Sequence, residues 1–350
     1  MNRLKHHHDS APPSATQSNS KTPAMQGFDA EFTDLVDYIL RITRRIWEGK
    51  QVGLCLDYYS ADCPVYTLSG VTIGAAEVTQ NTLATLASFP DRSLNAVNII
   101  CGGDAIDGFH SSHLITSHMT NLGDSDWGPA TGREATILVV AHCILKNNQI
   151  VEEWLVRDNY SLAQQLGHDP HLVAQTWANK PISSRLANWR NAELERLREQ
   201  VVFNRVAAGS DAESMIRGNL QNIWNAKMVG DVYQCYAVDA CLHGVSGRQL
   251  RGQDAIARFY TDILGTLSDL RFSLDYSCQQ PSESADQSAG IELAARWTLS
   301  GVHTGSALYG PPTGTTLFIL GESHYHIVEG LIVEEWNIFD ELSAVSYTHL

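Results

Sequence analysis

The sequence predicts an α+β protein built from two tandem copies of one domain. The segment Val-Glu-Glu-Trp at residues 151–154 recurs at 333–336, and at the same separation Gly-Pro-Ala-Thr-Gly at 128–132 aligns with Gly-Pro-Pro-Thr-Gly at 310–314. In each copy, segments with helical spacing of apolar residues precede four strand-like segments separated by Gly-, Asn- and Asp-rich turns. Helices followed by a run of consecutive strands indicate an antiparallel meander and therefore α+β, not alternating βαβ winding.

The length of 350 residues accommodates two such domains and a linker. We expect a disordered tail over residues 1–27, because this stretch is rich in Ser, Pro, Thr, Asn and Gln and lacks apolar periodicity. The first domain is expected over 28–170, a helical linker over 171–210 and the second domain over 211–345.

Composition excludes several classes of function. The formal net charge of −15 argues against nucleic-acid binding and against adhesion to an anionic membrane surface. No apolar run has the length needed to span a bilayer, and no secretory signal is readable. The seven cysteines are odd in number and form no Cys-x-x-Cys, which predicts reduced thiols and a cytoplasmic protein.

The first copy is expected to begin with a helix over 28–47, capped by Asp29, and a short helix or turn over 54–59. A strand beginning near residue 62 and a helix over 75–89 follow. The four predicted meander strands of this copy are 94–101, 108–120, 133–145 and 150–158.

The second copy repeats this order. Helices are expected over 215–224 and 254–267, with a strand over 240–245 between them. The predicted meander strands are 270–278, 290–304, 315–328 and 331–340, with a polar loop over 279–290. The last eight residues, 343–350, show no match to the first copy. A charged amphipathic helix within 183–206 is expected to link the units and pack across them; the alternative is a free helix for a partner.

Residues 294–305, 310–314 and 327–336 together resemble the SnoaL-like polyketide cyclases, which belong to the cone-shaped α+β superfamily of nuclear transport factor 2 and ketosteroid isomerase. The first copy resembles the same family through 128–132 and 150–154. The resemblance covers about 28–170 and 211–342. It implies that each unit curls its sheet around an apolar pocket lined by helices.

The resemblance also implies a general base at the position after the repeated Trp, where cyclases of this type carry Asp. This chain has Leu155 and Asn337 there, and neither side chain can take a proton. Side chains two residues apart on a strand share a face. The inward faces are therefore expected to carry Glu153, Leu155 and Arg157 in the first unit and Glu335, Asn337 and Phe339 in the second.

The family's catalytic histidine falls by gap-free counting on Ala141 and Ser323, each one residue before His142 and His324. A one-residue slip would restore a histidine, but it would also reverse the face of the sheet on which the side chain lies.

Acid–base chemistry must then use other inward groups. Burial raises the pKa of a carboxyl group, which suits Glu335 or Glu153 to proton transfer; the alternative is that each pairs with a basic group at the sheet rim. His303 and His113 are the candidate histidines, with a structural hydrogen-bonded role as the alternative. We expect Glu335 with His303 to be the working pair, because the second copy keeps more of the family pattern.

A metal site is not predicted, because His324 and His326 share a strand face but no third ligand follows at a clear spacing. No phosphate-binding Gly-rich loop is present. The side chains expected to contact substrate are Arg157, Asn337, Phe339, Leu155, Arg296, His142 and His324. The first unit has Arg157 at the position where the second has Phe339, which predicts that the first pocket binds an anionic group.

The sequence therefore predicts a cytoplasmic tandem protein that binds a small, largely apolar organic molecule. It is expected to perform cofactor-free acid–base chemistry of the cyclase, isomerase, dehydratase or hydrolase type; the alternative is a non-catalytic binding or assembly module. Trp154 and Trp336 are expected to pack the units together as an intrachain pseudo-dimer, with ligand stacking as the alternative and further homo-oligomerisation left open.

Overall fold

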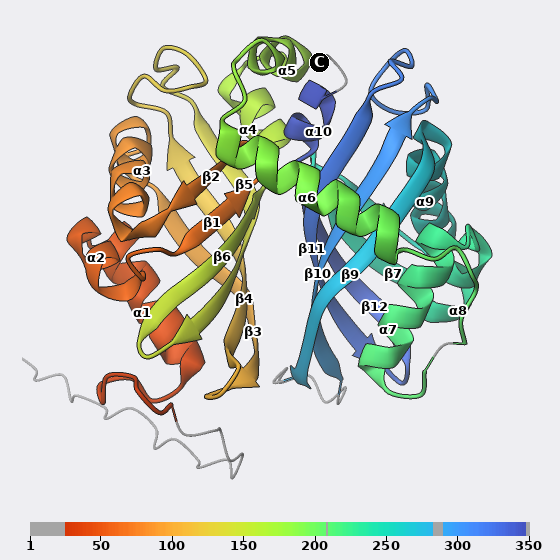
Figure 1. Cartoon of the computed structure of the whole chain (residues 1–350), viewed down its shortest axis with the longest axis horizontal. Coiled ribbons are helices and arrows are strands. Elements are labelled where there is room, and N and C mark those ends of the chain that lie inside the picture. Colours follow the sequence, from red (N-terminus) through yellow and green to blue (C-terminus); the bar gives the residue numbers. More distant parts are fainter. Residues whose placement is uncertain (1–24, 208, 283–289, 348–350) are drawn as a thin grey trace, which may run out of the picture.

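The computed structural model describes residues 25–207, 209–282 and 290–347. Two α+β units stand side by side, each with a curved sheet facing the centre of the molecule and helices on its outer side (Figure 1). In chain order the first unit consists of α1 (Leu35–Trp47), η1 (Val52–Leu54), α2 (Cys55–Tyr58), β1 (Pro64–Thr67), β2 (Gly70–Ile73), α3 (Gly74–Ser88), β3 (Ser93–Asp104), β4 (Gly108–Thr120), β5 (Glu134–Lys146), β6 (Gln149–Arg157) and α4 (Asn159–Leu166).

Two helices then connect the units, α5 (Pro170–Ala178) and α6 (Ser184–Gln200). The second unit repeats the order of the first. It consists of α7 (Ala212–Leu220), η2 (Gln221–Asn225), η3 (Val229–Asp231), α8 (Val232–Cys235), β7 (Tyr236–Gly244), β8 (Gln249–Arg251), α9 (Gln253–Thr266), β9 (Leu267–Pro281), β10 (Ile291–His303), β11 (Thr316–Val328), β12 (Leu331–Phe339) and α10 (Glu341–Tyr347).

Each sheet has six strands in the described residues, ordered β2-β1-β6-β5-β4-β3 and β8-β7-β12-β11-β10-β9. Only the β1–β6 and β7–β12 pairs are parallel among these strands, so each sheet is a mixed sheet built on an antiparallel meander. The hairpins that carry the repeated motif turn at Asn147-Asn148 and at Glu329-Gly330, and all four residues have positive φ. Positive φ at both positions defines the two-residue turn whose twist matches paired strands. The predicted α+β tandem fold is confirmed.

The first helix begins later than its apolar spacing suggests. Asp34, and not the expected Asp29, caps α1, because its Oδ1 accepts a 2.8 Å hydrogen bond from the backbone N–H of Asp37. Before this point the chain turns, and Phe28 packs edge-on against Tyr38 at 5.1 Å. The aromatic side chains therefore anchor a turn where the spacing predicted helix.

The repeat continues further toward the C-terminus than the sequence comparison indicated. Asp158 caps α4 through the N–H of Ser161, and Asp340 accepts a 3.1 Å hydrogen bond from the N–H of Ser343 at the start of α10. The segment expected to have no match in the first copy is thus the counterpart of α4. Residues 348–350, and all but the last three residues of the predicted tail, lie outside the described residues.

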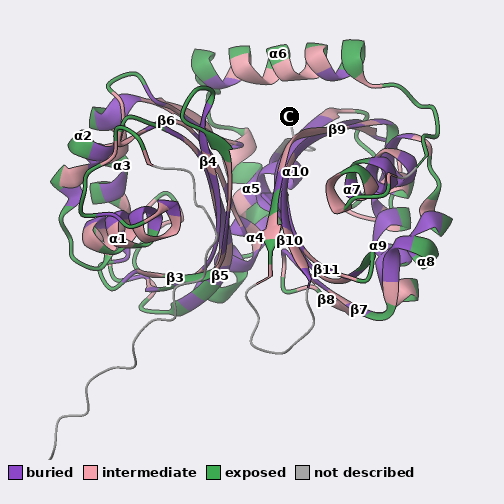
Figure 2. Cartoon of the chain, turned by 90° about the horizontal axis from the view of Figure 1, so that it is seen from below, coloured by how far each residue is buried: buried purple, intermediate pink, exposed green. Residues whose placement is uncertain are grey.

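The two sheets pack back to back, and each curls around its own helices (Figure 2). Trp154 is 9% exposed and lies at the contact, with the guanidinium of Arg296 from the second unit 3.4 Å from its ring centroid. Trp336 is only half-buried and stacks on His243 of its own unit at 5.2 Å. The pseudo-dimer is confirmed, and the first of the two indoles lies at its contact.

Helix α6 crosses both units, as predicted for the linker (Figure 1). Trp189 stacks on Tyr66 of the first unit at 5.0 Å and meets Phe318 of the second edge-on at 5.3 Å. Arg196 forms a 3.0 Å ion pair with Asp275 of the second unit. Within the described part of the chain, no helix is both long and apolar enough to cross a membrane.

Candidate active site and ligand cavity

The first unit encloses a cavity of about 490 Å³ between its sheet and helices α1 and α3. Three neighbouring strands supply its sheet wall through alternate residues. These are Ser111, His113 and Ile115 of β4, Val139, Ala141 and Cys143 of β5, and Glu153, Leu155 and Arg157 of β6. The three β6 residues therefore face inward, as strand alternation predicts.

The register of the sheet sorts these residues into levels. Glu153 lies opposite Cys143, Leu155 opposite Ala141, and Arg157 opposite Val139. His113 lies on the level of Leu155, because it is also paired with Ala141. Successive levels are about 7 Å apart, two residues along a strand. The cavity therefore presents a carboxyl group, an imidazole and a guanidinium in that order.

Glu153 is 5% exposed and bonded to a phenol rather than to a cation. Its Oε2 accepts a 2.8 Å hydrogen bond from the Tyr59 hydroxyl. In the described residues no basic side chain lies within ion-pair distance of Glu153, so the expected alternative of a rim ion pair does not apply. Burial raises the pKa of its carboxyl group, while the bond from Tyr59 opposes that shift.

His113 is 3% exposed and lines the cavity with an Nε2 that has no hydrogen-bond partner. Burial lowers its pKa to about 4, with a smaller contribution from the charge of His324. The imidazole is therefore neutral near pH 7. A neutral imidazole in the wall of a cavity can accept a proton from a bound molecule.

Two arginines stand together at the far end of the cavity. Arg157 was predicted there, and Arg92 was not, because it lies in the turn after α3 where no periodicity assigns a face. Arg92 is 5% exposed. Its Nε donates a 3.0 Å hydrogen bond to Ser117 Oγ, and its guanidinium lies 4.8 Å from the ring centroid of Trp47.

A second, outer space of about 830 Å³ adjoins this end, and Arg92 and Arg157 line both spaces. Residues between 177 and 186, which join α5 to α6, line one side of it. Ser343 and Ser346 of α10 line another. The approach to the first cavity is thus built from the first unit, the linker and the second unit together.

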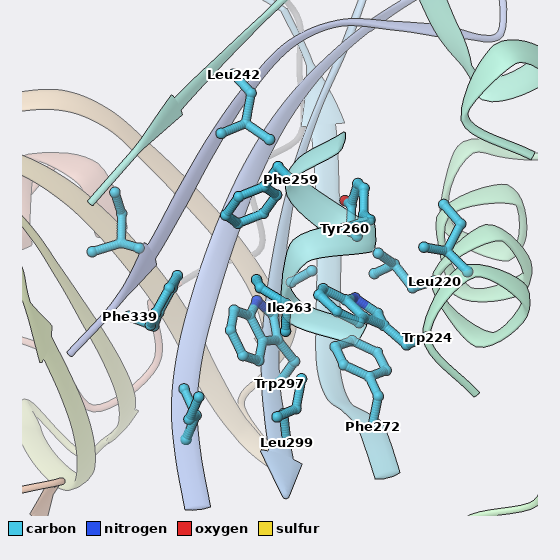
Figure 3. Close-up of a cluster of buried hydrophobic side chains, with 14 of the residues drawn as sticks. Leu220, Trp224, Leu242, Phe259, Tyr260, Ile263, Phe272, Trp297, Leu299 and Phe339 are labelled. Carbon is cyan, nitrogen blue, oxygen red and sulfur yellow. The ribbon is translucent and has the colours of Figure 1, made fainter. Parts of the chain in front are cut away.

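The interior of the second unit is packed with large side chains (Figure 3). The first unit has its cavity in the corresponding place. The matching registers of the two sheets identify the exchanges on the strands. Trp297, Tyr325 and Phe339 stand where the first unit has Ile115, Cys143 and Arg157, and Tyr260 of α9 takes the place of Thr82.

Gly321, the counterpart of Val139, makes room for one of these side chains. A Cβ at Gly321 would lie 2.1 Å from Cζ2 of Trp297, far inside van der Waals contact. The indole therefore occupies the space that a side chain on β11 would need.

Glu335 lies within this packed interior and is fully buried. It accepts hydrogen bonds from Tyr236 at 2.5 Å and from the amide of Asn337 at 2.9 Å. The Tyr–Glu pair is thus present in both units, but Glu153 lines the cavity of the first unit while Glu335 lies within the packed interior of the second. The geometry transfers the candidacy for proton transfer from Glu335 to the first unit.

The expected pairing of Glu335 with His303 is wrong. His303 ends β10, where its Nδ1 lies 3.1 Å from Thr313 Oγ1 and its backbone N–H bonds Thr315. Glu335 lies opposite Tyr325 of β11, which is ten residues along the chain from Thr315, the partner of His303. That separation is roughly 30 Å along a strand. His303 therefore has the structural role that was the alternative.

His142, His324 and Arg296 were expected to contact substrate, and all three lie at the contact between the sheets instead. His142 and His324 are fully buried. Alternation along β5 directs His142 away from the cavity that its neighbours Ala141 and Cys143 line. The register slip that would have restored a pocket histidine does not occur.

These interface groups form one hydrogen-bonded chain across the pseudo-dimer. Glu322 Oε1 accepts from Ser112 Oγ and lies 2.9 Å from His142 Nδ1. Ser112 Oγ lies 2.7 Å from His324 Nε2, and His110 Nδ1 lies 3.0 Å from His142 Nε2. The Ser112–His324 contact has the distance of a nucleophile and its base, but both residues are fully buried. Their role is to hold the units together.

In the described residues, no group of three His, Cys, Asp or Glu side chains is arranged to hold a metal ion.

Two of the residues expected to contact substrate, Asn337 and Phe339, point into the interior of the second unit. Asn337 donates a hydrogen bond to Glu335, and the ring of Phe339 lies 6.2 Å from the ring of Trp297. Both belong to the packed interior.

The fold defines a class first: two α+β units, each with a six-stranded mixed sheet curled around its own helices, joined sheet to sheet. The family model described as SnoaL-like polyketide cyclase matches residues 38–166 and 214–346, which is more than half of the chain. The chain therefore belongs to the SnoaL-like polyketide cyclase family and carries two tandem copies of its domain.

Several solved structures are similar to parts of the chain. TsrD from Streptomyces laurentii is 16% identical, with 38% of this chain and 94% of that chain covered and a TM-score of 0.34. IdmH, a putative polyketide cyclase from Streptomyces antibioticus, is 19% identical, with coverages of 38% and 97% and a TM-score of 0.33. AclR, a putative hydroxylase from Streptomyces galilaeus, is 21% identical, with coverages of 37% and 92% and a TM-score of 0.33. No curated protein matches the sequence.

Proposed function

We propose that the first unit binds a small, largely apolar organic molecule in its cavity and transfers protons on it without a cofactor. The observation that carries this proposal is His113, a neutral imidazole that lines the cavity and whose Nε2 has no hydrogen-bond partner. The corresponding residue of the packed unit is Ala295, by the register of β10 with β11. The imidazole is thus present in the unit with the cavity and missing from the unit whose interior is packed with large side chains.

The chemistry follows from the position of this base. Nε2 of His113 takes a proton from a carbon next to a carbonyl group, and an enolate forms. The enolate carbon then attacks a second carbonyl group, which closes a ring. Where the molecule has a carbon–carbon double bond next to the deprotonated carbon, a dienolate forms instead, and its protonation at the far carbon moves the double bond and isomerises the molecule. The imidazolium returns the proton in either case, so the protein is regenerated.

Glu153 supports this assignment as a carboxyl group that burial holds closer to its protonated form. Its bond with Tyr59 recurs as Glu335 with Tyr236 in the packed unit, which indicates that the pair also stabilises the fold. We therefore propose His113 as the proton-transfer residue and Glu153 as an adjacent acid. The second unit serves as the structural partner that completes the approach to the cavity.

Proton transfer can be measured before the natural substrate is known. The α-protons of 2-tetralone, a small bicyclic ketone, exchange with D₂O, and ¹H NMR follows that exchange in the presence of the full chain. The protein is expected to accelerate exchange, and His113→Ala is expected to reduce the acceleration about 10²- to 10⁴-fold, the usual contribution of a positioned base. His118→Ala, an exposed position on the same strand, is the control and should have no effect.

Undiminished exchange in the His113→Ala variant would assign the base to another residue, with Glu153→Gln as the next variant to measure. If the unaltered chain binds the ketone but does not accelerate exchange of its α-protons, the result supports the competing function, a non-catalytic ligand-binding module.

A further inference from the structure

Arg92 and Arg157 are two cationic groups in one cavity, and the carboxylates that attract them lie beyond contact distance, Glu48 for Arg92 and Glu153 and Asp340 for Arg157. Among the described residues, neither forms an ion pair within 4.0 Å of a carboxylate. The partners of Arg92 are neutral, the hydroxyl of Ser117 and the indole of Trp47. Arg157 Nε has no hydrogen-bond partner at all. The nearby Asp126, which also lines the cavity, is paired with Lys180 at 3.4 Å.

Such an arrangement is unfavourable without a counter-charge. Burial lowers the pKa of Arg92 to about 9, and the charge of Arg157 contributes to that shift. Burial also lowers the pKa of Arg157. Buried charges are normally paired, because an unpaired one loses its hydration without compensation. An anion placed between the two guanidinium groups would remove this cost.

The second unit indicates that the pair belongs to the cavity and not to the fold. Arg157 corresponds to Phe339, and Ser117 to Leu299. Arg92 corresponds to Leu270, since α3 and α9 end in the same hydrogen-bonded turn at Ser88 and Thr266. All three polar residues are thus apolar in the unit whose interior is packed, and that unit folds without them.

We propose that Arg92 and Arg157 together bind the carboxylate of an otherwise apolar ligand, so that the substrate class is an organic acid. This inference rests on the proposed function of the first unit. The carboxylate would lie at the end of the cavity that adjoins the outer space. The body of the ligand would then reach His113, one level or about 7 Å further in, and end near Glu153.

The pair of probes 1-naphthoate and methyl 1-naphthoate tests this assignment, because they differ in the carboxylate charge. Isothermal titration of the full chain is expected to show tighter binding of the acid than of the ester. Arg92→Met and Arg157→Met should each weaken binding of the acid about 10-fold or more, the contribution of a charge-assisted hydrogen bond, and leave the ester unchanged. Arg44→Met, an exposed position on α1, is the control.

A thermal melt provides a second measurement that does not depend on affinity. Because neither arginine forms an ion pair in the empty cavity and burial disfavours its charge, Arg92→Met is expected to keep or raise the melting temperature of the free protein. A large fall would show that Arg92 is a structural residue and would overturn the proposal. If Arg157→Met does not fold, Arg157→Lys keeps the charge and should retain a preference for the acid.

The possible outcomes separate the two proposals. Binding of neither probe would overturn the proposed ligand cavity itself. Equal binding of acid and ester, with no effect of either arginine variant, would overturn the carboxylate site and leave the cavity in place. Tighter binding of 1-naphthyl phosphate than of 1-naphthoate would overturn the carboxylate in favour of a phosphate-bearing ligand.

Discussion

A few side-chain exchanges decide which unit has a cavity. The backbone of both units follows the same order and register, yet Ile115, Cys143 and Thr82 leave a space that Trp297, Tyr325 and Tyr260 fill. Protein interiors are packed at crystal-like density, so each large side chain needs a small neighbour. Gly321 is the small neighbour that leaves room for the Trp297 ring.

Gly321→Ala should therefore destabilise the protein. The added Cβ would meet the Trp297 ring, and overpacking a core typically costs about 1–3 kcal/mol. The free energy of unfolding, measured with a chemical denaturant, should fall by that amount. Gly265→Ala in α9 is the matched control, since its Cβ would meet nothing within 4 Å. It should be neutral or stabilise the helix by about 1 kcal/mol. Equal effects of the two variants would contradict the packing account.

At the scale of single elements, α6 packs against both units and joins them. Its buried residues are Leu186 and Leu197, and its Trp189 contacts an aromatic side chain of each unit. Arg185 adds an exposed ion pair with Glu77 of the first unit at 2.8 Å, which contributes little on its own. The apolar contacts therefore account for most of the attachment.

Trp189→Ala should loosen α6 from both units. Each lost aromatic contact contributes about 0.5–1.5 kcal/mol beyond the apolar area it buries. Hydrogen exchange of the α6 amides, followed by mass spectrometry, should become faster, while exchange in the central strands β5 and β11 stays slow. Trp189→Phe keeps one ring and should show a smaller increase. Unchanged exchange in the alanine variant would show that the helix is held by other contacts.

At the scale of the whole molecule, the units share a buried polar network that titrates. Burial lowers the pKa of His324 and of His110 to about 4 from an ordinary value of 6.5. The pKa of Glu322 is also lowered, because the attraction of His142 and hydrogen bonds outweigh its burial. In all three cases the folded protein binds fewer protons than the unfolded chain over a range of acidic pH.

The free energy of unfolding should consequently fall as pH is lowered from about 6.5 to about 4. In that range the unfolded chain gains protons on its histidines that the folded network does not accept, which favours unfolding. Stability should fall further below pH 4.5, where the Glu322 carboxylate is protonated in the unfolded chain first.

Denaturant titrations at several pH values measure this dependence. His324→Asn should flatten the slope between pH 6.5 and 4 by at most about 1.4 kcal/mol per pH unit, the contribution of one proton. His118→Asn at an exposed position serves as the control and should leave the slope unchanged. A slope that is equally steep in the His324 variant would remove that histidine from the account.

The sequence by itself determined the tandem α+β fold and most of its strands. The period of apolar residues, the Asn-Asn and Glu-Gly turns and the repeated Val-Glu-Glu-Trp motif are local signals, and local signals define strands and hairpins. Alternation within β6 also placed Glu153, Leu155 and Arg157 on the inward face. The start of α1 was missed, because Phe28 and Phe32 continue the helical spacing while they anchor a turn.

Only the tertiary structure decided which unit has the open interior and which has the packed one. Motif resemblance favoured the second copy, but whether an interior is open depends on the summed volume of side chains from several strands and helices, which no single segment encodes. The position of Arg92 beside Arg157 also depends on tertiary packing, because the turn after α3 packs against β4 through the Arg92–Ser117 hydrogen bond. One residue of register separates His142 from the cavity and His324 from the interior of the second unit, since that single step moves a side chain to the opposite face of its sheet.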